Sequence, residues 1–299
     1  MAPSRPLSFR LLPLAWALLA IASSAPSQVT AAISGRIEDP SGNGVGGVAV
    51  SIRNLETGAT RSATTDEAGN FRVLSLPVGP YQVRAEKPGF KSEVRNGVDL
   101  VVGQEAVVRL RLELGDLAQE VTVNEQIPVV NTTTSSVSGL VGEREIKDLP
   151  LNGRSFDNLM TLNPGVINYG LKSANTSTSN GNTFSVEGRR PMDNLVLLNG
   201  IEYTGSSQLA ITPGGVSGYL LGIDAVREFN VETDTYGAEY GKRSGAQVSV
   251  VTQSGTNTLH GTFFEFLRNS ALDSRSVFAA TSFTPPFRQN QFGGAWAGR

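Results

Sequence analysis

Few side chains in this chain are suited to chemistry, and they are poorly grouped. There is a single histidine, His260, and there is no cysteine. A lone histidine lacks partners for a metal site or a Ser-His-Asp arrangement, and the missing thiols exclude disulfides, thiolate zinc sites and cysteine nucleophiles. Carboxylates such as Asp66, Asp224 and Glu228 fall in turns or alternating strands without calcium-loop spacing. We therefore expect no enzyme, no catalytic residue, no metal site and no cofactor.

Charge gives no argument for a nucleic-acid partner either. The formal net charge is -2 over 299 residues, so no basic excess is available for phosphate backbones. Arg189 and Arg190 form the one conspicuous basic pair. Because no glycine-rich strand-turn-helix accompanies them, we interpret this pair as a solvated or structurally paired face.

The first residues have the layout of a secretory signal peptide. Arg5 and Arg10 precede the apolar run LLPLAWALLAIA at residues 11–22, and small residues follow. The run is too short to span a bilayer, which needs about twenty apolar residues. We assign residues 1–32 to the signal peptide and expect export, with cleavage between residues 22 and 32.

Residues 33–114 alternate with the period of β-strands. In VAVSIRN, the apolar positions are Val48, Val50 and Ile52, and VVRLRLEL places four apolar residues on one face. Strict alternation indicates half-buried strands that share one core. Turn sequences such as DPSGNG, DEAGN and KPGF separate the strands. About seven strands at this spacing predict a small β-sandwich.

The same residues carry a family resemblance. The runs SGRIEDPSGNGVGGVAVSIRN and TTDEAGNFRVLSLPVGPYQVRAEKPGF resemble the carboxypeptidase regulatory-like domain. This resemblance implies a transthyretin-like β-sandwich of the carbohydrate-binding-like group. No aromatic platform for a sugar is evident, so we interpret the module as a folded spacer or docking domain.

Residues 115–138 form a linker that contains one β-prone stretch, QEVTVN, before a Thr/Ser tract. An isolated extended segment can add itself to the edge of a partner's sheet. The stretch is similar to the TonB box of outer-membrane active transporters, which implies TonB as the partner. The candidate box residues are Glu120, Val121, Thr122 and Val123; the alternative is a plain interdomain strand.

Residues 139–258 combine short helices and strands, so we predict an α+β domain. VGEREIKDLP and SFDNLMTLNPG give two short helical signals, the second with Ser155 as its cap and a buried stripe from Phe156 to Leu162. Asn199-Gly200 predicts a tight primed hairpin turn. The runs IDAVREFNVETDTYGAEYGKRSGAQVSVVTQSGTNTLHG, FFEFLRNSALDSRSVF and FRQNQFGG resemble, in that order, the Oar-like group of TonB-dependent receptors, which makes this segment a plug domain.

That resemblance makes residues 259–299 the start of an outer-membrane β-barrel. In TFFEFLR we expect Phe264 and Phe266 to face lipid and Glu265 to face the lumen. The segment supplies two strands at most, and two strands cannot close a sheet inside a bilayer. We interpret the chain, which ends within a strand, as the truncated N-terminal part of a longer protein.

The fold is thus expected to be mainly β: a sandwich, an α+β plug and the first barrel strands. The resemblance implies an outer-membrane receptor that takes up an unknown extracellular ligand, such as a carbohydrate, with energy delivered through TonB. The alternative is a secreted soluble binding protein that acts without a barrel. A regulatory module of a peptidase would need a catalytic domain that the sequence lacks.

Overall fold

A computed structural model describes most of the chain beyond the predicted signal peptide. The described residues are 31–115, 120–124, 137–149, 151, 154–168, 182–203, 213, 221–234, 242–272, 274 and 286–298. Residues 1–30 of the expected signal peptide lie outside them, and Ala31 and Ala32 already belong to the first strand. Among the described residues, no helix has the length and apolar character needed to cross a membrane.

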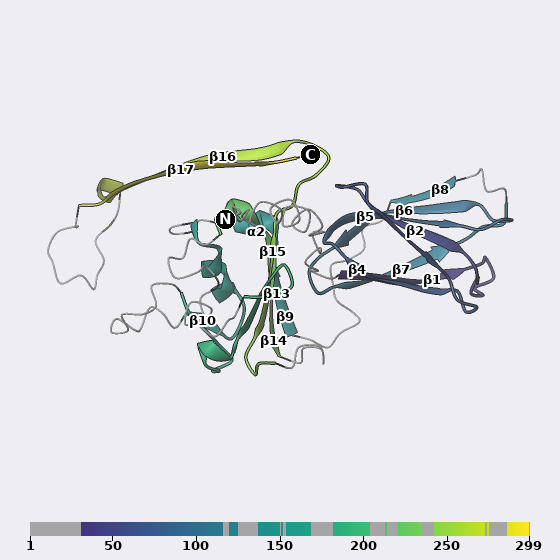
Figure 1. Ribbon diagram of the computed structural model, residues 1–299, viewed down its shortest axis with the longest axis horizontal. Helices are drawn as coiled ribbons and strands as arrows, with labels where there is room; N and C mark the ends of the chain where they lie inside the picture. The colour runs from purple at the N-terminus through teal and green to yellow at the C-terminus, as the bar shows by residue number, and fades with distance from the viewer. Residues whose placement is uncertain are drawn as a thin grey trace, which may run out of the picture.

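The N-terminal module is a two-layered β-sandwich, at one end of the molecule in Figure 1. Its strands are β1 (Ala31–Glu38), β2 (Ala49–Asn54), β3 (Thr60–Thr64), β4 (Asn70–Leu76), β5 (Gly79–Glu86), β6 (Ser92–Leu100) and β7 (Glu105–Arg111). One sheet has the order β4-β1-β7, and the other has the order β3-β2-β5-β6 with one further strand beyond β6. The seven predicted strands are therefore present.

Alternation places the core as the sequence predicts. Val48, Val50 and Ile52 are buried between the two sheets, and the β7 face that contains Val108 and Leu110 closes the core from the other side. Leu114 is an exception, because it is 70% exposed. It follows the last residue of β7, where the periodicity of a strand no longer controls side-chain direction.

Aspartates hold two of the predicted turns. The Asp39 carboxylate accepts hydrogen bonds from the backbone N–H groups of Ser41 and Asn43, and Asp66 accepts one from Asn70 in the same way. These bonds lower the pKa of both carboxyls, chiefly through the N–H groups of Asn43 and Asn70. The two aspartates therefore have a structural role in the turns.

The second module is built around a mixed sheet of order β13-β12-β15-β14-β9. Its strands are β9 (Val137–Val141), β12 (Leu195–Leu198), β13 (Ile201–Glu202), β14 (Val226–Asp234) and β15 (Gln247–Thr252), with β10 (Val166–Asn168) and β11 (Phe184–Val186) as a separate pair. Asn199 and Gly200 have φ values of 50° and 81°. This confirms the predicted primed turn between β12 and β13.

Of the two predicted helices, one is α-helical and one is not. Helix α2 (Glu143–Asp148) buries Ile146. The second is a 3-10 helix (Phe156–Leu162), and the Ser155 hydroxyl does not cap it, because it donates to the Asp157 carboxylate. Leu162 is 60% exposed, so the predicted buried stripe ends at Met160. The three-residue repeat of a 3-10 helix would keep Leu162 in line with Phe156 and Leu159, so its exposure comes from its place at the end of the element.

The last element is a hairpin of β16 (His260–Asn269) and β17 (Arg288–Ala297), which extends over the plug in Figure 1. The expected orientation of its aromatic residues is wrong. Phe264 and Phe266 lie on the face toward the plug, where both rings stack on the Arg154 guanidinium. The opposite face carries Phe263 and Trp296, which are 85% and 71% exposed. Alternation predicted which residues share a face, but a buried arginine decides which face is turned inward.

Arg154 joins the plug to this hairpin. Its Nη2 atom lies 2.6 Å from Asp224 Oδ2, in an ion pair that is almost fully buried. Thr262 of β16 donates to the other oxygen of Asp224 at 3.0 Å. The guanidinium centre lies 3.7 Å from the Phe264 ring centroid and 4.6 Å from that of Phe266, within the range of cation–π attraction. One buried cation thus holds the hairpin β16–β17 on the second module.

The sandwich depends on close approach of β1 to β7. A Cβ atom on Gly35 would lie 1.9 Å from the Val108 carbonyl oxygen. Gly35→Ala is therefore expected to force the two strands apart and to destabilise the sandwich by about 2–3 kcal/mol, measured by urea unfolding. Gly222→Ala is the control, because its Cβ would meet nothing within 4 Å. Equal stability of the two variants would contradict the close approach.

Arg154→Met is expected to loosen the hairpin from the plug. It leaves Asp224 buried without its cation, at a cost of about 3 kcal/mol, and faster amide hydrogen exchange in β16 is the measurement. Adding Asp224→Asn removes the unpaired charge and should restore part of the protection. Unchanged exchange in Arg154→Met would show that the hairpin is held by other contacts.

Candidate functional site

The stretch singled out by the sequence forms strand β8 (Glu120–Asn124). We expected an isolated extended segment, and this is wrong. Strand β8 pairs in parallel with β6, from Ser92 opposite Glu120 to Asn96 opposite Asn124. It becomes the last strand of the sheet β3-β2-β5-β6-β8, visible beside β6 in Figure 1. The sequence predicted a β-strand but gave no signal for its pairing, because parallel pairing is non-local and has no turn signature.

The outer edge of β8 has no paired strand in the described part of the chain. A strand at the end of a sheet presents a row of unused backbone N–H and C=O groups along that edge. Val121 and Thr122 are exposed, and Val123 is half-buried. The arrangement offers main-chain hydrogen bonds and alternate side-chain contacts to an incoming strand, which are the two requirements of β-strand addition.

Strand β6 contributes a buried carboxyl next to this pairing. Glu93, which stands opposite Val121 in the register, is 6% exposed. Burial raises the pKa of Glu93 above its ordinary value. A hydrogen bond from the Arg111 backbone lowers this pKa, but by less than burial raises it. Sequence reasoning missed this residue, because alternation along β6 gives no sign that both Ser92 and Glu93 are buried.

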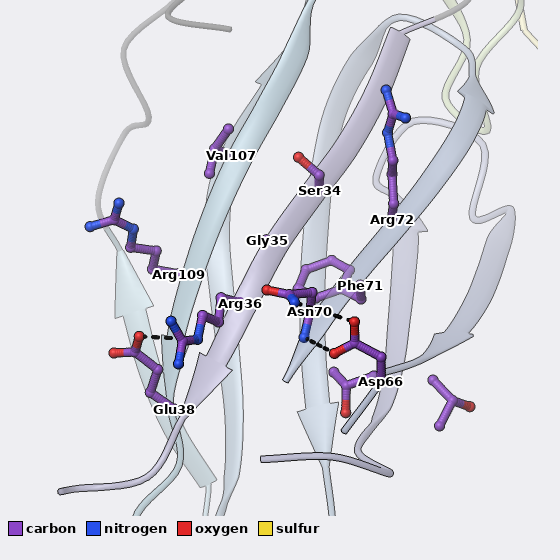
Figure 2. Close-up of a pocket in the computed structure, with 12 residues that line it drawn as sticks. Ser34, Gly35, Arg36, Glu38, Asp66, Asn70, Phe71, Arg72, Val107 and Arg109 are labelled. Atoms are coloured by element: carbon purple, nitrogen blue, oxygen red, sulfur yellow. Dashed lines mark hydrogen bonds and ion pairs between the residues drawn. The ribbon is translucent and has the colours of Figure 1, made fainter. Parts of the chain in front are cut away.

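A hollow with a volume of about 770 Å³ lies over the outer face of the sheet β4-β1-β7. Figure 2 shows the polar side chains around it. Arg36 pairs with Glu38 at 3.5 Å, and Arg72 pairs with Glu105 at 2.8 Å. Carboxylates neutralise both of these arginines. Arg109 also lines the hollow, so the two ion pairs account for two of its three arginines.

His260 lies at a smaller pocket of about 390 Å³ between the plug and the hairpin, lined also by Glu143, Lys147 and Asp224. Its Nδ1 atom lies 3.0 Å from the Thr258 carbonyl oxygen and 3.2 Å from Thr256 Oγ1. These contacts are local to the start of β16. Across the described residues, no three groups from His, Asp and Glu come together as a metal site would require.

The predicted structural pairing of Arg189 is confirmed. Its Nη1 atom donates to the Thr233 carbonyl oxygen at 3.0 Å, and Nη2 lies 3.9 Å from the Asp234 carboxylate. The guanidinium thus binds the end of β14. This agrees with the interpretation of Arg189 as a structurally paired residue and not as part of a phosphate site.

Comparison with protein families gives three matches in chain order. Residues 32–113 match the carboxypeptidase regulatory-like domain, residues 129–248 match the TonB-dependent receptor plug domain, and residues 251–299 match an outer membrane beta barrel domain. The first match covers the sandwich, the second contains most of the mixed sheet and α2, and the third contains the hairpin β16–β17. The order of modules agrees with the resemblance found in the sequence.

Among curated proteins, the chain is similar to the TonB-dependent transporter Oar of Myxococcus xanthus, with 28% identity over 252 residues. The match covers 81% of this chain and 22% of that protein, so the chain spans about a fifth of the length of its relative.

Among solved structures, the siderophore receptor PirA from Acinetobacter baumannii has a TM-score of 0.35 and 18% identity, over 50% of this chain and 22% of that one. A hydroxyquinol 1,2-dioxygenase from Pseudomonas putida has a TM-score of 0.25 and 11% identity, over 29% of this chain and 57% of that one. Superpositions this partial do not transfer a function.

The three domain matches stand in one order along the chain, and the similarity to Oar runs across most of it. The chain is therefore similar to the N-terminal part of an Oar-like TonB-dependent receptor, with a carboxypeptidase regulatory-like sandwich, a plug domain and an outer membrane beta barrel domain matched in that order.

Proposed function

We propose that this chain works in TonB-dependent uptake at the outer membrane, and that Glu120, Val121, Thr122 and Val123 are its TonB box. In this function, the sandwich and β8 lie on the periplasmic side and the plug closes the barrel of the whole receptor. An extracellular ligand binds the plugged barrel, TonB grips β8, and the pull that follows loosens the plug.

The single observation that supports this role for β8 is its place as the last strand of its sheet, with no further strand paired to it among the described residues. The strand lies at the end of a sheet, between two folded modules, with Val121 and Thr122 exposed. A partner strand added to this edge gains main-chain hydrogen bonds without first breaking the pairing with β6. The sandwich therefore presents the box in an extended form, which lowers the entropy cost of binding.

Strand β8 also has a composition suited to this form of recognition. β-branched residues occupy three successive positions, Val121, Thr122 and Val123, and such residues favour the extended backbone. Main-chain pairing tolerates many side chains, so specificity rests on alternate residues that face the partner. Val121 and Val123 share one face of the strand, and Thr122 lies on the other.

Val121→Pro is expected to abolish capture of the chain by purified TonB periplasmic domain in a pull-down. Proline removes a backbone donor from β8 and restricts its φ angle. Val121→Ala is the matched control, because it keeps the N–H group and shortens only the side chain, so capture should persist. Capture of the proline variant at the control level would exclude β8 as the binding strand.

Fractionation tests the location separately. Antibody against the sandwich is expected to follow the outer-membrane fraction of the native cells, because the family match places a barrel domain after the plug. Recovery of the antigen only as a soluble secreted protein would favour the alternative, a binding protein that acts without a barrel.

A further inference from the structure

One end of the sandwich touches the plug through three of its turns. Val78 follows β4, Val102 follows β6, and both are buried against Val251 at the end of β15 in a small apolar cluster. Glu56, in the turn after β2, accepts a hydrogen bond at its carbonyl oxygen from the Asn257 N–H group at 2.9 Å. The two modules therefore meet directly, in addition to their covalent connection.

Two adjacent residues of β14 make the polar part of this contact. Arg227 binds the Glu56 carboxylate with both terminal nitrogens, at 2.7 and 2.9 Å. Glu228 Oε1 accepts the Val102 N–H at 2.6 Å. Neighbouring residues of a regular strand point to opposite faces, so both reach the sandwich only because the register against β15 shifts between Val226 and Glu228. A bulge of this kind redirects a side chain.

The contact is specific but small. The sandwich and the plug each have a large apolar core of their own, whereas the cluster between them consists of three valines. The polar groups are mostly withdrawn from water: Glu228 is 6% exposed, and the side chains of Arg227 and Glu56 are 15% and 25% exposed. Desolvation offsets much of what such pairs contribute, so the two modules can separate without either of them unfolding.

We propose that this contact is a releasable latch between sandwich and plug, closed in acid and loosened as the pH rises. The latch is independent of the role of β8. If the proposed function holds, the latch also lies on the path of the pull, because β8 pairs with β6 and β6 leads into Val102.

Glu228 supplies the pH response. Burial raises the pKa of Glu228 to about 7, and the negative charge of Glu143 on α2 adds to this rise. The hydrogen bond from the Val102 N–H and the charge of the Arg227 guanidinium lower the pKa, but by less. When the modules separate, the carboxyl regains water and its pKa returns toward 4.5, its ordinary value. The docked state therefore binds the proton more tightly. Its extra stability is fully present below about pH 4.5 and is lost as the pH rises through about 7.

The test measures the distance between the modules in the full chain. The sequence has no cysteine, so Ser62→Cys on β3 and Ile167→Cys on β10, both at exposed positions, can carry two spin labels without background. Pulsed electron paramagnetic resonance is expected to give a narrow distance distribution at about pH 5 and a broad one at about pH 8, since the docking constant falls roughly ten- to hundredfold across this range.

Three variants make the result specific. Glu228→Gln keeps an oxygen acceptor for Val102 but does not titrate, so its distribution should stay narrow at both pH values. Arg227→Met removes the bond to Glu56 and should broaden the distribution at both. Asp99→Asn alters an exposed carboxyl of β6 and should leave the response of the parent chain unchanged. Far-ultraviolet circular dichroism confirms that each variant is folded.

The outcomes separate the latch from the proposed function. A distribution that is narrow at both pH values in the parent chain, or that responds equally in Glu228→Gln, overturns the latch. TonB capture by Arg227→Met should equal that of the parent, because β8 is unaltered. Loss of capture in the parent itself would refute the proposed function and leave the distance result as it stands.

Discussion

Unpaired backbone groups at strand edges are the constraint on which the arrangement of this chain depends. A sheet of finite width always has two edges, and each exposes N–H and C=O groups that seek partners. In the sandwich, β8 pairs with the edge of β6, and within the described part of the chain the edge of the sheet then lies on β8. The exposed edge is thereby moved from the folded domain to the connecting segment, where a partner can use it.

The contact between the sandwich and the plug does not depend on backbone pairing at strand edges. It depends on charged side chains more than on buried apolar area. Both modules close their own cores, so little apolar surface is left for the joint. Arg227 and Glu228 then fix the orientation through directional bonds to Glu56 and Val102. A polar joint of this kind gives a defined geometry with modest net stability.

Much of the fold was predictable from the sequence, because alternation and turn chemistry are local. The buried positions of β2, the Asn199-Gly200 turn and helix α2 were all predicted correctly. The errors have a common origin. Alternation does not show which face of a strand is covered, so the predicted orientation of Phe264 was wrong. Local sequence does not encode the partner of a parallel strand, so the pairing of β8 with β6 was not predicted. The roles of Arg154, Arg227 and Glu228 could not be predicted, because their hydrogen bonds join residues 70 to 171 positions apart in the sequence.

The direction of β8 decides what a pull on it would do. Parallel strands share hydrogen bonds that are slanted and evenly spaced, so a force along the axis of β8 loads the whole ladder from Glu120 to Asn124 at once. Peeling the strand sideways would break the same bonds one after another. If the proposed partner adds to the outer edge of β8 and pulls along the strand, it meets the stronger resistance. The load then passes into β6 and on to Val102, whose N–H is held by the plug through Glu228. The same force acts on both contacts in such a series. On this geometry the contact at β14 gives way before the box strand leaves the sandwich, because it has three hydrogen bonds against five paired positions between β6 and β8.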